Sequence, residues 1–166
     1  MILRGIDFGP IMNASGARGF FGNKYSHQRF LGPFGPNWNG CTFVAKTTTL
    51  EARQGNMPMR EDGVTPKELL PRCIMPNFRP GNITLSIRMF LEGIMLNAVS
   101  LSGPGAKALF ETGQWQERTK PLFISFMSVA LTPEGRIEEL KQFVNLLAHF
   151  LPDFKAKVGL QINYTC

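Results

Sequence analysis

The sequence predicts a parallel α/β fold, because strand-like and helix-like segments alternate along its 166 residues. Four runs are almost continuously apolar or β-branched, a pattern typical of strands that are buried on both faces. The segments between these runs are long enough for the crossover connections that parallel strands require. Polar motifs follow the runs, at the ends where parallel sheets carry their chemistry.

The four predicted strands are Pro10 to Ser15, Cys41 to Leu50, Pro121 to Val129, and Val158 to Cys166. The clearest helix is predicted from Pro133 to Leu151, where apolar residues recur at spacings of three and four. Thr132 is its expected N-cap, with Pro133 at the first helical position. A weaker helix is predicted over Ala106 to Glu111, ending at Gly113.

Two stretches lack a clear periodicity and are predicted to be irregular. The first runs from Gly19 to Gly40, with a short helix expected around Ser26 to Leu31. The second is rich in proline, spans residues 61–92, and is expected to form a loop excursion over the mouth of the fold. We expect residues 1–166 to form one domain.

Composition excludes several functional classes. The net charge is +6, but Lys and Arg are scattered, so nucleic acid is not an expected partner. The excess of basic residues indicates either an ordinary basic surface or attraction toward an anionic small ligand. No apolar run approaches the ~18 residues of a membrane span. Asp7 interrupts the region where a signal peptide would still be apolar. Three cysteines without CxxC spacing predict no disulfide scaffold and no metal site, which favours a cytoplasmic protein.

The first strand-to-helix turn distinguishes between two parallel architectures. Residues 13–19 read Asn-Ala-Ser-Gly-Ala-Arg-Gly and lack the GxGxxG pattern of a doubly wound dinucleotide-binding sheet. A TIM barrel instead collects its chemistry from the ends of several strands. The sequence therefore favours a barrel.

Polar residues at the strand ends admit both structural and functional interpretations. Lys46 is either a lysine that extends to the surface or a cation held against a ligand that becomes negative during reaction. Ser15 is either an ordinary turn residue or one of several small residues that leave room for a flat ligand to approach the backbone. Asn163 needs partners for both faces of its amide. Cys166 is either a small buried apolar residue or a base.

Taken in order, four segments resemble the dihydroorotate dehydrogenases, FMN-dependent TIM-barrel enzymes of pyrimidine biosynthesis. They are Met12-Asn13-Ala14-Ser15-Gly16; Ala45-Lys46-Thr47-Thr48-Thr49-Leu50-Glu51 with Arg53-Gln54-Gly55-Asn56; Asn97-Ala98-Val99-Ser100-Leu101; and Asn163-Tyr164-Thr165-Cys166. The resemblance implies that FMN is contacted by Ala14, Ser15, Lys46, Thr47 and Asn163. It implies a pocket for orotate or dihydroorotate lined by Lys46, Asn97, Val99, Ser100, Leu101 and Asn163. Cys166 matches the base of that family's soluble branch.

The resemblance implies removal of a proton from one carbon of a dihydropyrimidine and hydride transfer from its neighbour to FMN. Since a TIM barrel takes ~250 residues, the chain is expected to be the N-terminal half of one, ending after the fourth strand. Unpaired strand edges would then favour association into homo-oligomers. The electron acceptor is left open among fumarate, NAD and quinone. The alternatives are an enzyme of the dihydropyrimidine dehydrogenase type and a non-catalytic remnant that binds a partner.

Overall fold

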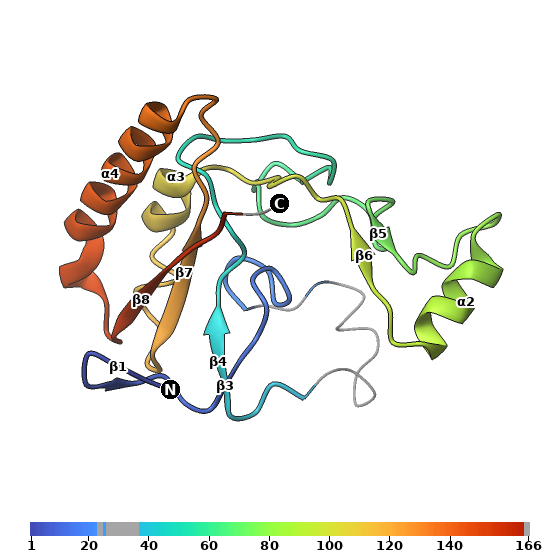
Figure 1. Cartoon of the computed structure of the whole chain (residues 1–166), viewed down its shortest axis with the longest axis horizontal. Helices are drawn as coiled ribbons and strands as arrows, with labels where there is room; N and C mark the ends of the chain where they lie inside the picture. Colours follow the sequence, from blue (N-terminus) through green and yellow to red (C-terminus); the bar gives the residue numbers. More distant parts are fainter. Residues whose placement is uncertain (23–24, 26–36, 165–166) are drawn as a thin grey trace.

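A computed structural model describes residues 1–22, 25 and 37–164 and shows a mixed α/β fold built on a four-stranded parallel sheet (Figure 1). The strand order is β3-β4-β7-β8, and each neighbouring pair is parallel. The strands are β3 (Ile11–Met12), β4 (Cys41–Val44), β7 (Leu122–Phe126) and β8 (Val158–Ile162). The prediction of four parallel strands at these places is confirmed.

The strands are shorter than the apolar runs predict. Regular pairing of β4 ends at Val44, but the N–H groups of Ala45 and Thr48 still donate to carbonyls of β7, at 2.9 Å each. The predicted strand to Leu50 is therefore a strand followed by an irregular extension that stays attached to the sheet. β8 ends at Ile162, and Cys166 lies outside the described residues, as does the helix expected around residues 26–31.

Two helices cover one face of the sheet: α3 (Ala106–Glu111) and α4 (Pro133–Phe150), the latter continued by the 3₁₀ turn η2 (Leu151–Asp153) (Figure 1). Both helices match their predictions. At the start of α4 the Thr132 side chain accepts a hydrogen bond of 3.1 Å from the N–H of Gly135, which confirms Thr132 as the N-cap. Among the described residues, no helix combines the length and apolar character that crossing a membrane requires.

Aromatic side chains fill the layer between this sheet face and the helices. Phe126 of β7 stacks on Phe143 of α4 with ring centroids 4.1 Å apart, and Phe110 of α3 stacks on Phe150 at 5.2 Å. The fully buried Trp115 donates its Nε1–H to the carbonyl of Phe20 at 2.6 Å. Large aromatic surfaces removed from water make this layer the main source of stability.

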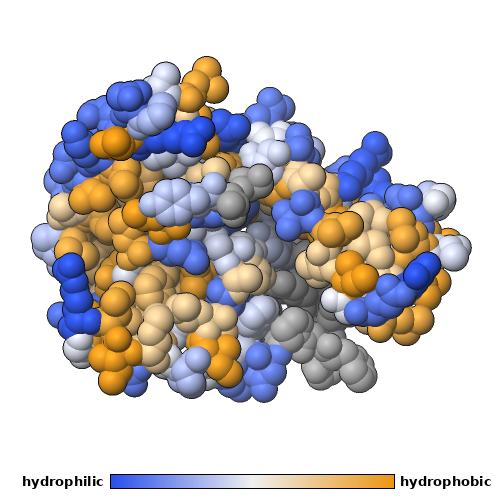
Figure 2. Space-filling model, viewed as in Figure 1, coloured by the Kyte–Doolittle hydropathy of each residue, from blue (hydrophilic) through white to orange (hydrophobic). Residues whose placement is uncertain are grey.

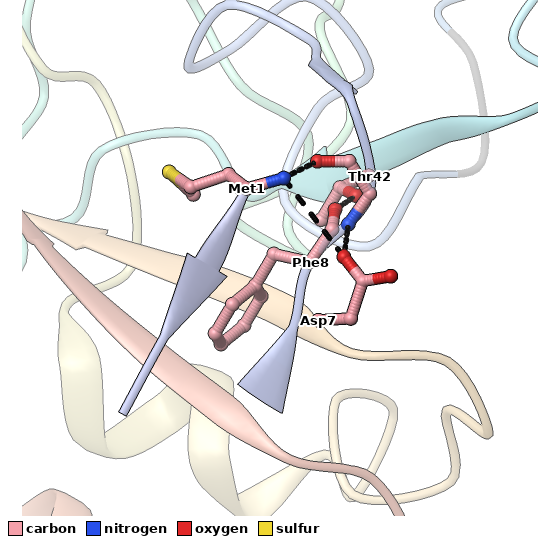
Figure 3. A network of polar contacts seen from close by, with 5 residues as sticks. Met1, Asp7, Phe8 and Thr42 are labelled. Carbon is pink, nitrogen blue, oxygen red and sulfur yellow. Dashed lines mark hydrogen bonds and ion pairs between the residues drawn. The ribbon is translucent and has the colours of Figure 1, made fainter. Parts of the chain in front are cut away.

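An N-terminal hairpin, β1 (Ile2–Leu3) and β2 (Ile6–Asp7), packs on the sheet through Ile6, which lies against the cluster of Phe8, Val44 and Phe123. Phe8, which directly follows β2, is buried, and its ring centroid lies 4.4 Å from that of Phe123. Figure 3 shows how this end is held: the amino group of Met1 lies beside Asp7 at 3.8 Å, and Thr42 donates to the carbonyl of Phe8. The hairpin thus inserts one aromatic ring against the lower part of the sheet.

The proline-rich excursion is more ordered than predicted. Within and just after residues 61–92 the chain forms β5 (Ile74–Met75), α2 (Ile83–Leu91) and β6 (Leu96–Asn97), with β5 and β6 antiparallel. We call residues 74–97 the arm, because they project away from the sheet (Figure 1).

The helix α2 was not predicted from the sequence. Its nine residues follow several prolines and are apolar on more than one side, and this pattern obscures the helical period. Its exposed apolar side chains are Ile83, Leu85, Ile87, Phe90 and Leu91, seen as an apolar region at the right of Figure 2.

Candidate functional site

A chain of hydroxyl groups crosses the carboxyl ends of the central strands. Ser15, which follows β3, lies with its Oγ 2.8 Å from Oγ1 of Thr47, which follows β4. The same Thr47 oxygen lies 2.9 Å from Oγ of Ser125 in β7. Because parallel strands end at one edge of the sheet, residues distant in sequence meet there.

Asn163, which follows β8, completes this arrangement by donating from Nδ2 to Oγ1 of Thr47 at 3.2 Å. The direction of the hydroxyl chain is fixed by Ser15, whose single hydroxyl proton is donated to the carbonyl of Ala45 at 3.0 Å. Thr47 must therefore donate to Ser15 and accept from Ser125 and Asn163. All of the hydrogen-bonding capacity of the Thr47 hydroxyl is used within the protein.

Lys46 is buried, with 6% of its surface exposed, so the surface-lysine interpretation is wrong. Its Nζ donates to the carbonyl of Ser102 at 2.7 Å and lies 4.7 Å from the ring centroid of Phe20. Its backbone N–H donates to the carbonyl of Gly19 at 3.0 Å. A buried ammonium is stable when it is hydrogen-bonded, and the aromatic face adds cation–π attraction.

The segment that contains Asn97 to Leu101 is held by Asn56. Its Nδ2 lies 2.9 Å from both the carbonyl of Ala98 and Oγ of Ser100, and its backbone N–H donates to the carbonyl of Val99 at 3.0 Å. Thus two of the four motifs, residues 53–56 and 97–101, pack directly on each other.

Gly55 allows this close packing. It has a φ of +54°, and a Cβ there would lie 2.2 Å from Oγ of Ser102 and 2.7 Å from the carbonyl of Val99. Ser102 itself is fully buried and bridges the segments, donating to the Val99 carbonyl and accepting from the N–H of Met57, at 3.0 Å each. A larger residue at position 55 would displace this bridge.

The predicted site residues fall into two groups. Ser15 and Asn163 each contact Thr47, and Lys46 joins the second group through Ser102. In that second group Asn97 ends β6 and is exposed, Val99 and Ser100 are half-buried, and Leu101 is buried. Ala14 is exposed beside the first group, and Cys166 lies outside the described residues.

Several residues of this site were missed by sequence reasoning. Ser125 is a single hydroxyl within the apolar run Leu-Phe-Ile-Ser-Phe, a signal that a buried polar partner is nearby. Asn13 is buried and bonds both ways to Val44, accepting from its N–H at 3.1 Å and donating to its carbonyl at 2.9 Å. This amide continues the pairing between β3 and β4 beyond the short strand.

The arrangement offers a buried ammonium, an amide and three hydroxyl groups at one edge. These groups are hydrogen-bonded to one another or to backbone carbonyls. Among the described residues, no group of His, Cys, Asp or Glu side chains is arranged to hold a metal ion. Comparison of the chain with protein-family models, characterised proteins and solved structures finds no match to any of them.

Proposed function

We propose that the chain supplies the N-terminal half of a TIM-barrel, FMN-dependent oxidoreductase of the dihydroorotate dehydrogenase type, acting in the cytoplasm on a dihydropyrimidine. One observation carries the proposal. Side chains from separate motifs, Ser15, Thr47 and Asn163, meet at the carboxyl edge of a parallel sheet. The buried Lys46 directly precedes Thr47 and links this edge to Ser102. Active sites of parallel barrels are built at this edge.

The donor set suits FMN. An ammonium and an amide can bind the carbonyl and ring nitrogen atoms at the polar edge of a flavin, and the exposed Ala14 leaves room for a flat ring beside them. When bound, FMN would accept the hydride that leaves the substrate. The charge of Lys46 would favour the reduced, anionic form of the cofactor.

Thr47 has a different role from the one that the resemblance alone implies. Its hydroxyl is occupied by three protein partners, so contact with a flavin falls to its backbone. We assign its side chain, with Ser125, to positioning Ser15 and Asn163. Residues that are locked by such hydrogen bonds hold a site in its productive geometry.

The substrate would lie against the segment from Asn97 to Leu101 and near Asn163. An asparagine amide presents a donor and an acceptor together, which matches the imide and carboxylate edges of orotate. Cys166 would accept the proton from the carbon next to the one that gives up the hydride. A thiol with an ordinary pKa of ~8.5 can act in this way once its surroundings favour the thiolate.

The first test is to express the complete reading frame and record its visible absorbance. The proposal predicts flavin absorbance that is bleached anaerobically by dihydroorotate. Bleaching by dihydrouracil alone would indicate the dihydropyrimidine dehydrogenase type. A product without flavin would support the non-catalytic, partner-binding alternative and overturn the proposal.

The second test concerns the base. Cys166→Ala should preserve flavin binding and ligand affinity and slow flavin reduction by roughly 10²–10⁴-fold, the usual contribution of a positioned base. Cys41→Ala is the matched control, because Cys41 is a free cysteine at the start of β4, whereas the candidate site lies beyond the end of that strand. An unchanged rate in the Cys166 variant would show that proton abstraction lies elsewhere.

A further inference from the structure

Two arginines converge on the buried aromatic ring of Phe43 in β4. Arg118, in the connection before β7, has its Cζ 4.1 Å from the ring centroid of Phe43, and Arg18 has its Cζ 5.4 Å from the same centroid. The Cζ of Arg18 also lies 5.7 Å from the ring of Trp38. We call Arg18, Trp38, Phe43 and Arg118 the arginine cluster. It is separate from the site described above.

The two guanidinium groups also approach a common point beside Gly22. A Cβ on this glycine would lie 3.2 Å from Nη1 of Arg118 and 3.5 Å from Nη2 of Arg18. Nη1 of Arg118 donates to the carbonyl of Phe21 at 3.1 Å, which fixes the orientation of that side chain. A side chain on Gly22 would press on both guanidinium groups, so a glycine at this position allows the two cations to lie close together.

Three nitrogen donors of this cluster lack an acceptor. They are Nε of Arg18, Nε of Arg118 and Nε1 of Trp38, each buried and without a hydrogen-bond partner in the described structure. Buried donors in native proteins are nearly always paired with protein, water or an ion. Three unpaired donors in one cluster therefore indicate a missing acceptor.

The charge of the cluster is also unbalanced. In the described part of the chain neither arginine forms an ion pair, and the adjacent Glu117 is paired with Lys155 instead. Burial lowers the pKa of both guanidinium groups, and the charge of Arg18 lowers that of Arg118 further. Two neighbouring cations that form no ion pair with a carboxylate in the described part of the chain favour the binding of an anion.

We propose that the arginine cluster binds a small oxyanion carrying two negative charges, of the phosphate class. Two guanidinium groups balance two charges, and their planar N–H groups match the oxygen atoms of phosphate. Arg118 also borders an open pocket of about 750 Å³ that is lined by Glu111, Glu117 and Asp153. Because these carboxylates repel anions, we place the phosphate outside this pocket, against the two guanidinium groups themselves. Free inorganic phosphate and the phosphate group of a metabolite share this chemistry.

Thermal unfolding of the full gene product in increasing inorganic phosphate tests the proposal. A ligand that binds only the folded state should raise Tm along a saturating curve, by about 5–10 °C at one hundred times Kd. Chloride at matched ionic strength should not reproduce the rise. A phosphate monoester that raises Tm at lower concentration than inorganic phosphate would identify a metabolite as the source.

Variants locate the effect. Arg18→Gln and Arg118→Gln should each abolish the saturating rise, whereas Arg88→Gln, a surface arginine of α2 paired with Glu92, should retain it. A linear response, or one that is equal in all three variants, would overturn the proposal.

A second measurement needs no variant. Phenylglyoxal modification of the wild-type protein, followed by peptide mass spectrometry, should be slowed at Arg18 and Arg118 by phosphate and left unchanged at Arg88. Equal modification rates with and without phosphate would also overturn the proposal, even if the variants fail to fold.

Discussion

The ammonium of Lys46 donates a hydrogen bond of 2.7 Å to the carbonyl of Ser102, 56 residues further along the chain. This bond joins the end of the central strand β4 to the segment that resembles a substrate-binding loop. A lysine at this position therefore connects two parts of the candidate site in addition to carrying a charge.

Replacing this lysine should affect both stability and flavin chemistry. Lys46→Met leaves a buried carbonyl without its donor, so we expect a loss of about 1.5–3 kcal/mol in the free energy of unfolding, measured with urea. In a flavin-bound protein it should also slow reduction of FMN. Lys107→Met removes an exposed lysine of α3 and should change stability by less than about 0.5 kcal/mol. Equal effects of the two substitutions would contradict a joining role for Lys46.

Gly55 provides a sharper test of the packing between the two motifs. Gly55→Ala combines a positive φ with a steric clash against Ser102 and Val99. Gly93→Ala is the matched control, since Gly93 has a φ of +69° and open space around it. The control should lose about 1–2 kcal/mol of stability from backbone conformation alone. The Gly55 variant should lose clearly more in the same urea experiment, and a similar loss would show that the segment adjusts freely.

Sequence reasoning predicted the sheet because its signals are local. Runs such as Leu122 to Phe126 are apolar at every position except Ser125 and become strands that are buried throughout. The N-cap of α4 was predictable because Thr132 and Pro133 act within one turn of the helix. Strand lengths were overestimated because apolar character continues past the last regular pair, as at Ala45.

The remaining features depend on contacts between residues far apart in sequence. Thr47 and Ser125 are 78 residues apart, and nothing local in either segment specifies the other. The same holds for Arg18 and Arg118, which meet only because the chain folds around Phe43. The helix α2 was missed because its apolar side chains face outward as well as inward, so its pattern is not that of a helix with one buried face.

The outward-facing side chains of α2 should promote association. Contiguous exposed apolar surface of this kind drives contact between molecules. The triple substitution Ile83→Gln, Ile87→Gln and Leu91→Gln should therefore reduce the concentration-dependent mass seen by sedimentation. Ile137→Gln with Val144→Gln, which removes exposed apolar side chains from α4, is the control and should leave association unchanged. If both sets act alike, association does not depend on the arm.

Cys73 should remain protonated at higher pH than an ordinary thiol. Burial raises the pKa of its side chain, and the charge of Glu68 raises it further. The folded state then holds a proton that the unfolded state releases, so stability should fall as pH rises above the ordinary thiol value of ~8.5. Site-resolved alkylation rates across pH should show a raised midpoint at Cys73. Glu68→Gln should lower that midpoint. Glu134→Gln, at the exposed start of α4, is the control and should not change it. Identical alkylation profiles for the two variants would rule out the contribution of Glu68.

The hydroxyl chain at the sheet edge should behave as a coupled network. Thr47→Val removes the partner of Ser15, Ser125 and Asn163 together, and we expect a loss of about 1–3 kcal/mol in the free energy of unfolding. Ser125→Ala should cost less, because Thr47 keeps two of its three partners. Once Thr47 is replaced, Ser125 has already lost its acceptor, so adding Ser125→Ala should cost little more.

A double-mutant cycle measures this dependence. The loss in the Thr47→Val and Ser125→Ala double variant should fall short of the sum of the single losses by about 0.5–3 kcal/mol. Thr112→Ala, which removes a hydroxyl bonded to Leu109 at the end of α3, is the control partner and should combine additively with Thr47→Val. Coupling in the first cycle and none in the second would show that Ser125 acts through Thr47. Additivity in both cycles would mean that each hydroxyl is held independently and that Ser125 has no part in positioning Ser15 and Asn163.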